Sequence, residues 1–280
     1  MNVVRLADIP WEDRINVDNW PSRAGMYYDN RKTELCIRLI DYPCGSIEPR
    51  HVHAGTHATT VLKGRAIVDG LTLGPLDVVL GPSNEPHGPL DYPDGCKLLS
   101  AFQGSYYHSE VQTLSGEKQY RLIQANDIPW IRGGDGVEVK TLVDRGAGRL
   151  RVEAMRFPPG AQHAPQFLAA LVVDGSAVVG RETLGEWDFV YADEGQARST
   201  LTFPQGATLL ALTLRSWAYS RSDLTGKEEL ASGPVDCELV GLGVSALYES
   251  CHDDFSPEIK TVFGLPQAVS ASLPASFRKM

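Results

Sequence analysis

Short apolar segments recur along most of the chain, and polar turn residues separate them. Representative segments are LCIRLIDY, TTVLKGRAIV, LDVVLG, LRVEAMRF and TLLALTLR, which begin at residues 35, 59, 76, 150 and 208. They are rich in β-branched and aromatic residues, and Gly, Pro, Asp or Asn interrupts them about every eight to twelve residues. No helical period is evident before about residue 224. The pattern predicts an all-β sandwich or barrel.

The chain also contains an internal repeat. The segment that begins at Leu73-Gly74 aligns without a gap on the segment that begins at Leu184-Gly185, a shift of 111 residues. At the same shift Lys63-Gly64 falls on Asp174-Gly175, and the tetrapeptide at residues 8–11, Asp-Ile-Pro-Trp, recurs at residues 127–130. An internal duplication of β segments predicts two similar barrels in tandem.

These observations suggest a division of the chain into three parts. We expect an N-terminal barrel over residues 1–115 and a C-terminal barrel over residues 116–225. Residues 226–280 would form a tail that is partly helical or packs on the barrels or on a partner. The stretch Arg145-Gly146-Ala147-Gly148-Arg149 is interpreted as a hairpin turn between two strands.

Composition and charge narrow the range of functions. The chain has 280 residues, 42% of them hydrophobic, and a formal net charge of -9, which disfavours binding to nucleic acid or to an anionic membrane. No apolar run is long enough to cross a bilayer, and the N-terminus does not resemble a secretory signal. The five cysteines form no CxxC pair. We therefore expect a cytoplasmic protein with reduced thiols.

Four of the seven histidines form one pattern in the first half. His51, His53 and His57 share a strand parity, so all three can point to the same side of a sheet. His87 follows a Pro-rich turn and would enter a neighbouring strand, which brings it beside the other three. Neutral imidazole is a common ligand of zinc, iron, nickel and copper, so several imidazoles inside one barrel are typical of a metal site. The spacing therefore predicts a metal site.

The pattern resembles the two sequence motifs of the cupin superfamily. The resemblance is carried by Gly45, His51, His53, His57 and Gly64 in a first motif, and by Gly74, Pro82, Asn84 and His87 in a second. It implies two tandem cupin jelly-roll β-barrels, of which the first holds one divalent metal ion. Cupins of this kind usually carry Glu at the position of His57 and Gly at that of Asn84. Asn tolerates positive φ, but the loss of Glu leaves a site of neutral ligands. His57 would be a fourth ligand, a neighbour of the ligands or a contact of the substrate.

The second half lacks these histidines. At the 111-residue shift the four positions hold Gln162, Ala164, Leu168 and Arg198, although another alignment of the loop would place His163 at a ligand position. We expect the second barrel to be structural, to build an oligomer or to cover the mouth of the first barrel. The resemblance to double cupins also implies a homodimer.

A divalent metal with only neutral ligands favours a bidentate anionic oxygen ligand, such as an enolised β-diketone or a hydroxy-ketone. Strand parity predicts that Thr59 and Val61 line the cavity above the metal. Phe102 and Tyr106, with Tyr107 and His108, lie near the end of the next strand and could shape its mouth. The residues alone do not identify a catalytic group.

The His-x-His-x-Gly stretch at residues 51–55 resembles the histidine-ligated cupins that include acetylacetone-cleaving and dihydroxyacetophenone dioxygenases, and also the cupin domains of zinc-binding anti-sigma factors. The first resemblance implies a non-haem Fe(II) dioxygenase that cleaves a small β-dicarbonyl or an aryl or hydroxy ketone. Two alternatives stay open: an isomerase, lyase or hydrolase that uses a metal such as Zn(II), Ni(II) or Mn(II) without oxygen, and a zinc-binding sensor without turnover.

Overall fold

A computed structural model describes residues 1–214, apart from residues 16–20, 31–33, 105–107, 111–119, 147–148 and 194. Within these ranges the regular structure is β-strand, except for three short 3-10 turns: η1 (Leu6–Asp8), η2 (Ala125–Asp127) and η3 (Gly134–Gly136). The prediction of an all-β chain is confirmed. None of the helical segments in the described part is long and apolar enough to span a membrane.

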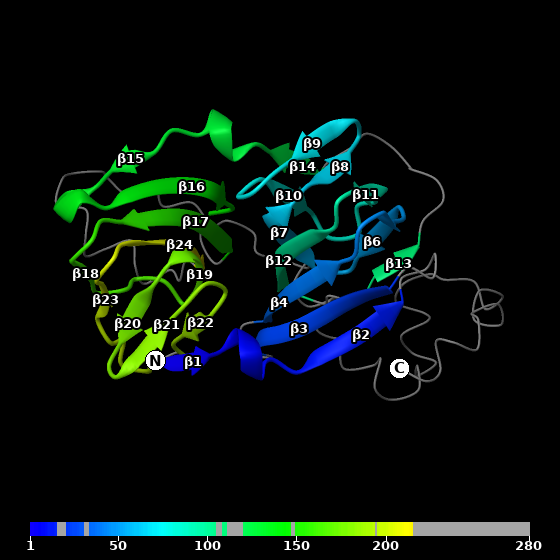
Figure 1. The fold of residues 1–280 in the computed structure, drawn as a ribbon. Coiled ribbons are helices and arrows are strands. Elements are labelled where there is room, and N and C mark those ends of the chain that lie inside the picture. Colours follow the sequence, from blue (N-terminus) through cyan, green and yellow to red (C-terminus); the bar gives the residue numbers. More distant parts are fainter. Residues whose placement is uncertain are drawn as a thin grey trace, which may run out of the picture. The chain divides into compact units, whose positions relative to one another are not determined.

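The first barrel is built from three antiparallel sheets (Figure 1). The largest has seven strands in the order β14 (Arg121–Ile123), β10 (Val78–Gly81), β7 (Thr56–Gly64), β12 (Cys96–Gln103), β4 (Leu35–Tyr42), β3 (Pro21–Asn30) and β2 (Trp11–Ile15). The second has four strands in the order β5 (Ser46–Glu48), β11 (Leu90–Tyr92), β8 (Ala66–Val68) and β9 (Leu71–Leu73). The third pairs β13 (His108–Glu110) with β6 (His51–His53).

The second barrel repeats the two larger sheets. Its seven-stranded sheet has the order β1 (Asn2–Val4), β22 (Phe189–Tyr191), β19 (Ala169–Gly175), β24 (Ala207–Leu214), β17 (Leu150–Phe157), β16 (Glu138–Asp144) and β15 (Ile131–Arg132). Its four-stranded sheet has the order β18 (Ala161–His163), β23 (Leu201–Phe203), β20 (Ala177–Val179) and β21 (Glu182–Leu184). The predicted tandem of two jelly-roll barrels is therefore confirmed.

Three apolar clusters account for the core. One fills the first barrel and contains Val61, Leu73 and Tyr92, while another fills the second barrel and contains Leu184 and Phe203. The third joins the two seven-stranded sheets and contains residues of both, among them Leu39, Val78 and Leu80 from the first and Leu142, Leu150 and Phe189 from the second. Alternation along each central strand explains this arrangement, because one face points into its barrel and the other into the shared layer.

Each half of the sequence contributes its first strand to the other half's sheet. Strand β1 pairs with β22, and strand β14, which precedes the second barrel, pairs with β10. In Figure 1 the blue strand β1 accordingly lies beside β22 among the strands of the second barrel. The exchange is symmetric. Each exchanged strand leads into a 3-10 turn, and each turn ends at the Asp of the repeated Asp-Ile-Pro-Trp tetrapeptide.

The duplication extends to individual hydrogen bonds. Asp77 accepts one backbone N–H from Gly74 at 2.8 Å and a second from Ala125 at 2.7 Å. At the 111-residue shift Asp188 accepts from Gly185 and from Leu6, both at 2.9 Å. In each barrel one carboxylate therefore fixes a turn of its own sheet and also the exchanged segment of the other half.

Parts of the expected organisation lie outside the described residues. These are the boundary between residues 115 and 116, the tail over 226–280, and the residues Tyr106 and Tyr107. The boundary and the tail stay predictions.

Candidate metal centre

Two of the four histidines of the motif lie on β6, and a third lies on the loop between β10 and β11. His51 and His53 are the end residues of this three-residue strand, so both side chains point to the same face. The backbones of His51 and His87 form a β-bridge, with N–H···O distances of 3.0 and 2.9 Å in the two directions. Asn84, on the same loop, has φ +59° and donates its N–H to the carbonyl of His53 at 2.8 Å. The tolerance of Asn for this conformation, which the sequence suggested, is confirmed.

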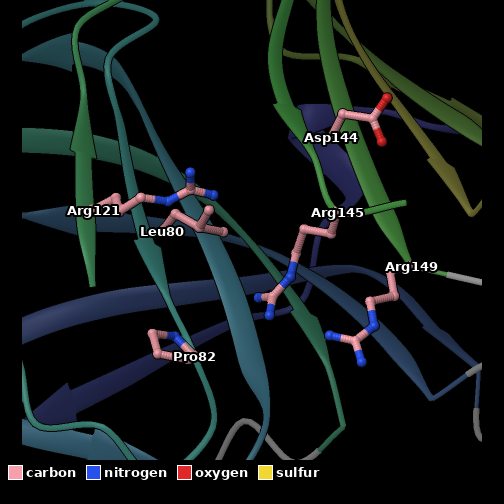
Figure 2. Close-up of a pocket in the computed structure, with 6 residues that line it drawn as sticks. All are labelled: Leu80, Pro82, Arg121, Asp144, Arg145 and Arg149. Carbon is pink, nitrogen blue, oxygen red and sulfur yellow. The ribbon is translucent and has the colours of Figure 1, made fainter. Parts of the chain in front are cut away.

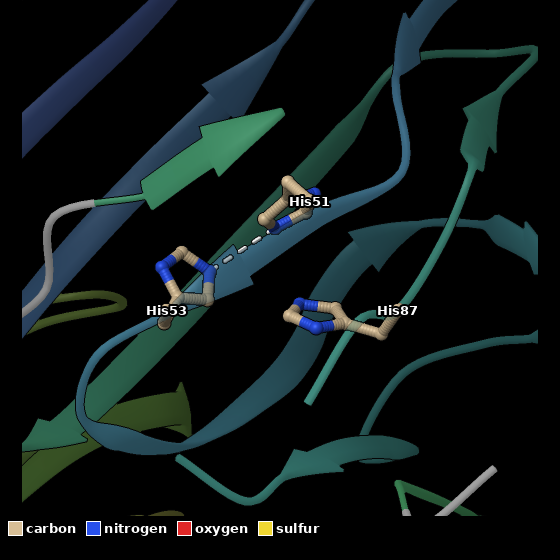
Figure 3. Close-up of side chains that lie close together, drawn as sticks. All are labelled: His51, His53 and His87. Carbon is tan, nitrogen blue, oxygen red and sulfur yellow. Dashed lines mark hydrogen bonds between the residues drawn. The ribbon is translucent and has the colours of Figure 1, made fainter. Parts of the chain in front are cut away.

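These three histidines form a compact buried group (Figure 3). One imidazole nitrogen from each of His51, His53 and His87 lies within 4.8 Å of the others, and the side chains are between 2% and 6% exposed. The Nε2 atoms of His51 and His53 are 3.1 Å apart. Ligand nitrogens about 2.1 Å from a metal are about 3.0–3.4 Å apart in octahedral or tetrahedral geometry. The spacing therefore suits a divalent metal ion.

Backbone carbonyls fix which nitrogens face the cluster. The Nδ1 of His51 lies 2.7 Å from the carbonyl of Pro49, and the Nδ1 of His87 lies 3.2 Å from that of Glu85. A carbonyl only accepts, so each Nδ1 carries the proton and donates it. The Nε2 atoms then keep their lone pairs, as a metal ligand must.

Burial keeps His51 uncharged. It lowers the pKa of His51 to about 4, although the hydrogen bond to the carbonyl of Pro49 acts in the opposite direction. A neutral imidazole at neutral pH is the form that binds metal, so no proton has to leave before an ion enters.

His57 lies beside the triad but is not one of its three mutually close members. Its ring centroid is 4.7 Å from the centroids of His53 and His87. It is 2% exposed, and its Nδ1 has no hydrogen-bond partner among the described residues. Burial and then the nearby His87, His51 and Arg145 hold the pKa of His57 well below its usual value. A buried imidazole with a ring nitrogen that makes no hydrogen bond, next to three candidate ligands, suits a fourth ligand or a group that contacts bound substrate.

A glycine makes room for the ring of His57. Gly81 of β10 pairs with His57 of β7, and a Cβ at Gly81 would lie 2.1 Å from Cε1 of that ring. On the other side Phe102 of β12 pairs with His57, and its ring lies 5.0 Å from that of His53 and 5.5 Å from that of His57. The ring of His57 therefore packs between Gly81 and Phe102, and its place depends on the absence of a side chain at Gly81.

The other predicted pocket residues have different surroundings. Val61 is 1% exposed inside the first barrel, as its parity predicts. The hydroxyl of Thr59 is 2.9 Å from that of Ser100. Phe102 is buried against the histidines, and Tyr106 lies outside the described residues. Their role in binding a substrate stays a prediction.

A carboxylate missed by the sequence analysis lies next to the triad. The Oε1 of Glu48 is 3.7 Å from Nε2 of His51, and its Oε2 accepts a hydrogen bond from the hydroxyl of Tyr92 at 2.8 Å. The motif lacks its usual Glu, so the sequence suggested purely neutral surroundings, and the structure differs on this point. Glu48 comes from β5, whose pairing with β11 places it opposite Leu90. The only signal in the sequence was its position three residues before His51.

The second barrel has no comparable group among the described residues. His163, on β18, lies opposite Leu201, which is the position that Glu48 holds opposite Leu90 in the first barrel. Its ring contacts Phe157 and Phe167, and burial lowers its pKa. His163 therefore replaces Glu48 rather than a predicted ligand.

No protein-family model matches the chain, and no curated protein matches its sequence. Solved structures do match. A protein from Nostoc punctiforme with a provisionally assigned dioxygenase activity has a TM-score of 0.66 at 12% identity, covering 84% of this chain and 87% of that one. An oxalate decarboxylase variant from Bacillus subtilis has a TM-score of 0.54 at 13% identity, covering 93% and 85%. Salicylate 1,2-dioxygenase from Pseudaminobacter salicylatoxidans has a TM-score of 0.50 at 13% identity, covering 65% and 71%.

At such low identity these likenesses concern the fold. The chain has the double jelly-roll fold of these proteins, and its buried histidine triad is suited to one divalent metal ion.

Proposed function

We propose that this chain is a metal-dependent enzyme, a non-haem Fe(II) dioxygenase that cleaves a carbon–carbon bond in a small β-dicarbonyl or an aryl or hydroxy ketone. The observation that carries the proposal is the buried group of His51, His53 and His87, whose three ligand nitrogens lie within 4.8 Å of one another. The fold shared with two proteins described as dioxygenases supports the reaction class.

The residues around the triad would have separate roles in this reaction. His51, His53 and His87 would hold a ferrous ion, which would supply oxygen activation and Lewis acidity toward an enolised substrate. His51 and His87 hold their ligand nitrogens in place through the carbonyls of Pro49 and Glu85. His57 and Phe102 exclude water from one side of the site, because both are almost fully buried.

Glu48 gives this site a group that can take a proton. Its Oε1 lies 3.7 Å from the Nε2 of His51, so it is close to any molecule that binds beside that ligand. The phenol of Tyr92 holds its other oxygen. Glu48 is thus placed to accept the proton that an enolising substrate loses.

The alternative is a reaction that uses no oxygen. The likeness to oxalate decarboxylase, a protein with Mn(II) centres, favours this second candidate. The same three histidines and the same carboxylate would serve it, with the metal acting as a Lewis acid.

The test is oxygen consumption by protein that was purified without air and without affinity-resin metals, then loaded with Fe(II), Mn(II) or Zn(II). We expect the Fe(II) protein to consume oxygen with at least one member of a panel of β-diketones and aryl ketones. The His51→Ala variant should lose both metal and uptake. If iron-loaded protein consumes no oxygen with any substrate of the panel, the proposed dioxygenase function is wrong. Substrate loss without oxygen uptake would establish the alternative.

His57→Leu separates the two roles of that residue, since Leu is what the second barrel carries at this position. Retention of about one metal per chain with altered KM would place His57 against the substrate. Loss of the metal would make it a ligand.

A further inference from the structure

A cavity of about 360 Å³ lies next to the metal centre but on the other side of strand β10. Leu80 and Pro82 line it from β10 and its following loop, Arg121 lines it from β14, and Asp144, Arg145 and Arg149 line it from the end of β16 and the start of β17. Its volume is within the range of small-molecule sites.

The alternation of β10 separates this cavity from the histidines. Gly81 pairs with His57 and abuts its ring inside the barrel. Leu80, the preceding residue, pairs with Ala58 and with Arg121, and both Leu80 and Ala58 belong to the apolar cluster that joins the two barrels. Successive residues of a strand face opposite sides, so the cavity lies outside the first barrel.

The cavity has an excess of positive charge. Figure 2 shows the guanidinium groups of Arg121, Arg145 and Arg149 directed toward a common space, while the carboxylate of Asp144 points away from them. Asp144 instead accepts the N–H of Gly146 at 2.9 Å and lies 3.7 Å from Arg151. No carboxylate of a described residue forms an ion pair with any of the three arginines of the cavity.

The three cations also affect one another. Arg145 is half-buried, and its pKa is lowered by burial and then by Arg149 and Arg121. Like charges that converge without a counter-ion raise the free energy of the protein, and an anion between them would relieve this. Guanidinium groups recognise carboxylate and phosphate through paired N–H···O bonds.

We propose that this pocket of Arg121, Arg145 and Arg149 is a binding site for a small dianion, either a phosphate group or a dicarboxylate. The argument for this site does not rest on the proposed function. Its ligand would bridge β14 and β10 of the first barrel's sheet to the β16–β17 hairpin of the second. It would also contact Pro82, the first residue of the loop that carries His87.

The test is calorimetric titration of metal-free His51→Ala protein with inorganic phosphate, pyrophosphate and malonate, and with acetate as a monoanion, at constant ionic strength. The His51→Ala background prevents binding of the probes to a metal. We expect at least one dianion to bind with a Kd below about 1 mM, and acetate to bind far more weakly. Binding of the two phosphates without malonate would identify a phosphate group as the ligand, and the reverse would identify a dicarboxylate.

Single Arg145→Gln, Arg149→Gln and Arg121→Gln changes should each weaken that binding about tenfold, because each removes one charged hydrogen-bond donor. Arg181→Gln removes the same charge from an exposed position in the second barrel and is the matched control. Thermal unfolding in chloride buffer shows whether each variant is folded. The proposal is overturned if no probe binds, or if Arg181→Gln weakens binding as much as Arg145→Gln does.

Discussion

The two barrels share a scaffold and differ inside it. Gly64 and Gly175 occupy the same place at the end of a central strand, with φ of +79° and +78°. A Cβ there would lie 2.2 Å from the carbonyl oxygen of Gly95 in one barrel and 2.4 Å from that of Gly206 in the other. The backbone contacts that close the barrels are the same in both copies, while the candidate metal ligands are present in only one.

The two barrels differ in the length of one loop and at individual positions. Glu48 and His163 are equivalent by their pairing with Leu90 and Leu201, and Ala58 and Ala169 by their pairing with Leu80 and Tyr191. Nine residues lie between Glu48 and Ala58 in the first barrel, and five lie between His163 and Ala169 in the second. The second barrel is therefore four residues shorter where the first barrel carries β6 with His51 and His53. An ungapped alignment at a shift of 111 residues fails in this loop for the same reason.

Substitution completes the loss. At positions that stay in register with β7 and β10, His57 becomes Leu168 and Gly81 becomes Ala192. Gly81 is needed only because the ring of His57 occupies the space of its Cβ. Once the histidine is replaced, an alanine can occupy the position of the glycine.

The largest contrast between the barrels should be in metal binding. His51→Ala removes a nitrogen from the group of three, and the two that remain bind a divalent ion far more weakly. His163→Ala changes a partly buried histidine of the second barrel that has no partner ligands among the described residues. Elemental analysis should show about one metal per chain in the wild type and in His163→Ala, and almost none in His51→Ala. Equal metal content in all three proteins would mean that the ion lies elsewhere.

The shared scaffold should be equally sensitive in both halves. Gly64→Ala and Gly175→Ala each place a Cβ against a backbone carbonyl at positive φ, and each should lower the free energy of unfolding by about 3 kcal/mol. Gly70→Ala and Gly180→Ala, at positive φ with open space around them, should cost only about 1 kcal/mol. Urea unfolding measures all four variants. A tolerated Gly175→Ala would show that the second barrel closes differently.

These contrasts show what the sequence could and could not reveal. The candidate ligands His51 and His53, with His57, could be grouped from the sequence because they obey the two-residue period of a strand, which is local information. Glu48 was missed because it reaches the site through the pairing of β5 with β11. The arginine pocket was missed because β14 pairs with β10, while Arg145 and Arg149 had been interpreted only as parts of a turn. Register between distant strands is not written in either segment alone.

Acid should destabilise the metal-free protein through the first barrel. The pKa of His51 is about 4 in the folded chain against 6.5 for the free side chain, so the unfolded chain binds the proton more readily. The contribution of His51 to the free energy of unfolding is therefore complete above pH 6.5. It falls by about 3 kcal/mol as the pH decreases toward 4.

Urea unfolding of metal-free protein at several pH values between 8 and 4 would measure this loss. His51→Gln should flatten the pH dependence. His163→Gln should change the pH dependence less, because His163 lies in an only partly buried site, where burial lowers its pKa. Identical pH profiles for wild type and His51→Gln would contradict the assignment.

The smallest contrast concerns the two carboxylates that join the exchanged segments to the barrels. Asp77→Asn and Asp188→Asn each replace one accepting oxygen by an amide NH2 group, which only donates. One backbone N–H then loses its partner, at about 1–3 kcal/mol. Asp188 also pairs with Arg5 at 2.9 Å. Arg5 is partly exposed, so loss of this ion pair should add less than about 1 kcal/mol. Asp188→Asn should therefore be slightly more destabilising in urea than Asp77→Asn. Relative to an Arg5→Gln background, which already lacks the ion pair, Asp188→Asn should cost no more than Asp77→Asn costs in the wild type. If the exposed control Asp174→Asn costs as much as either change, the loss is a general charge effect and the two carboxylates do not secure the exchange.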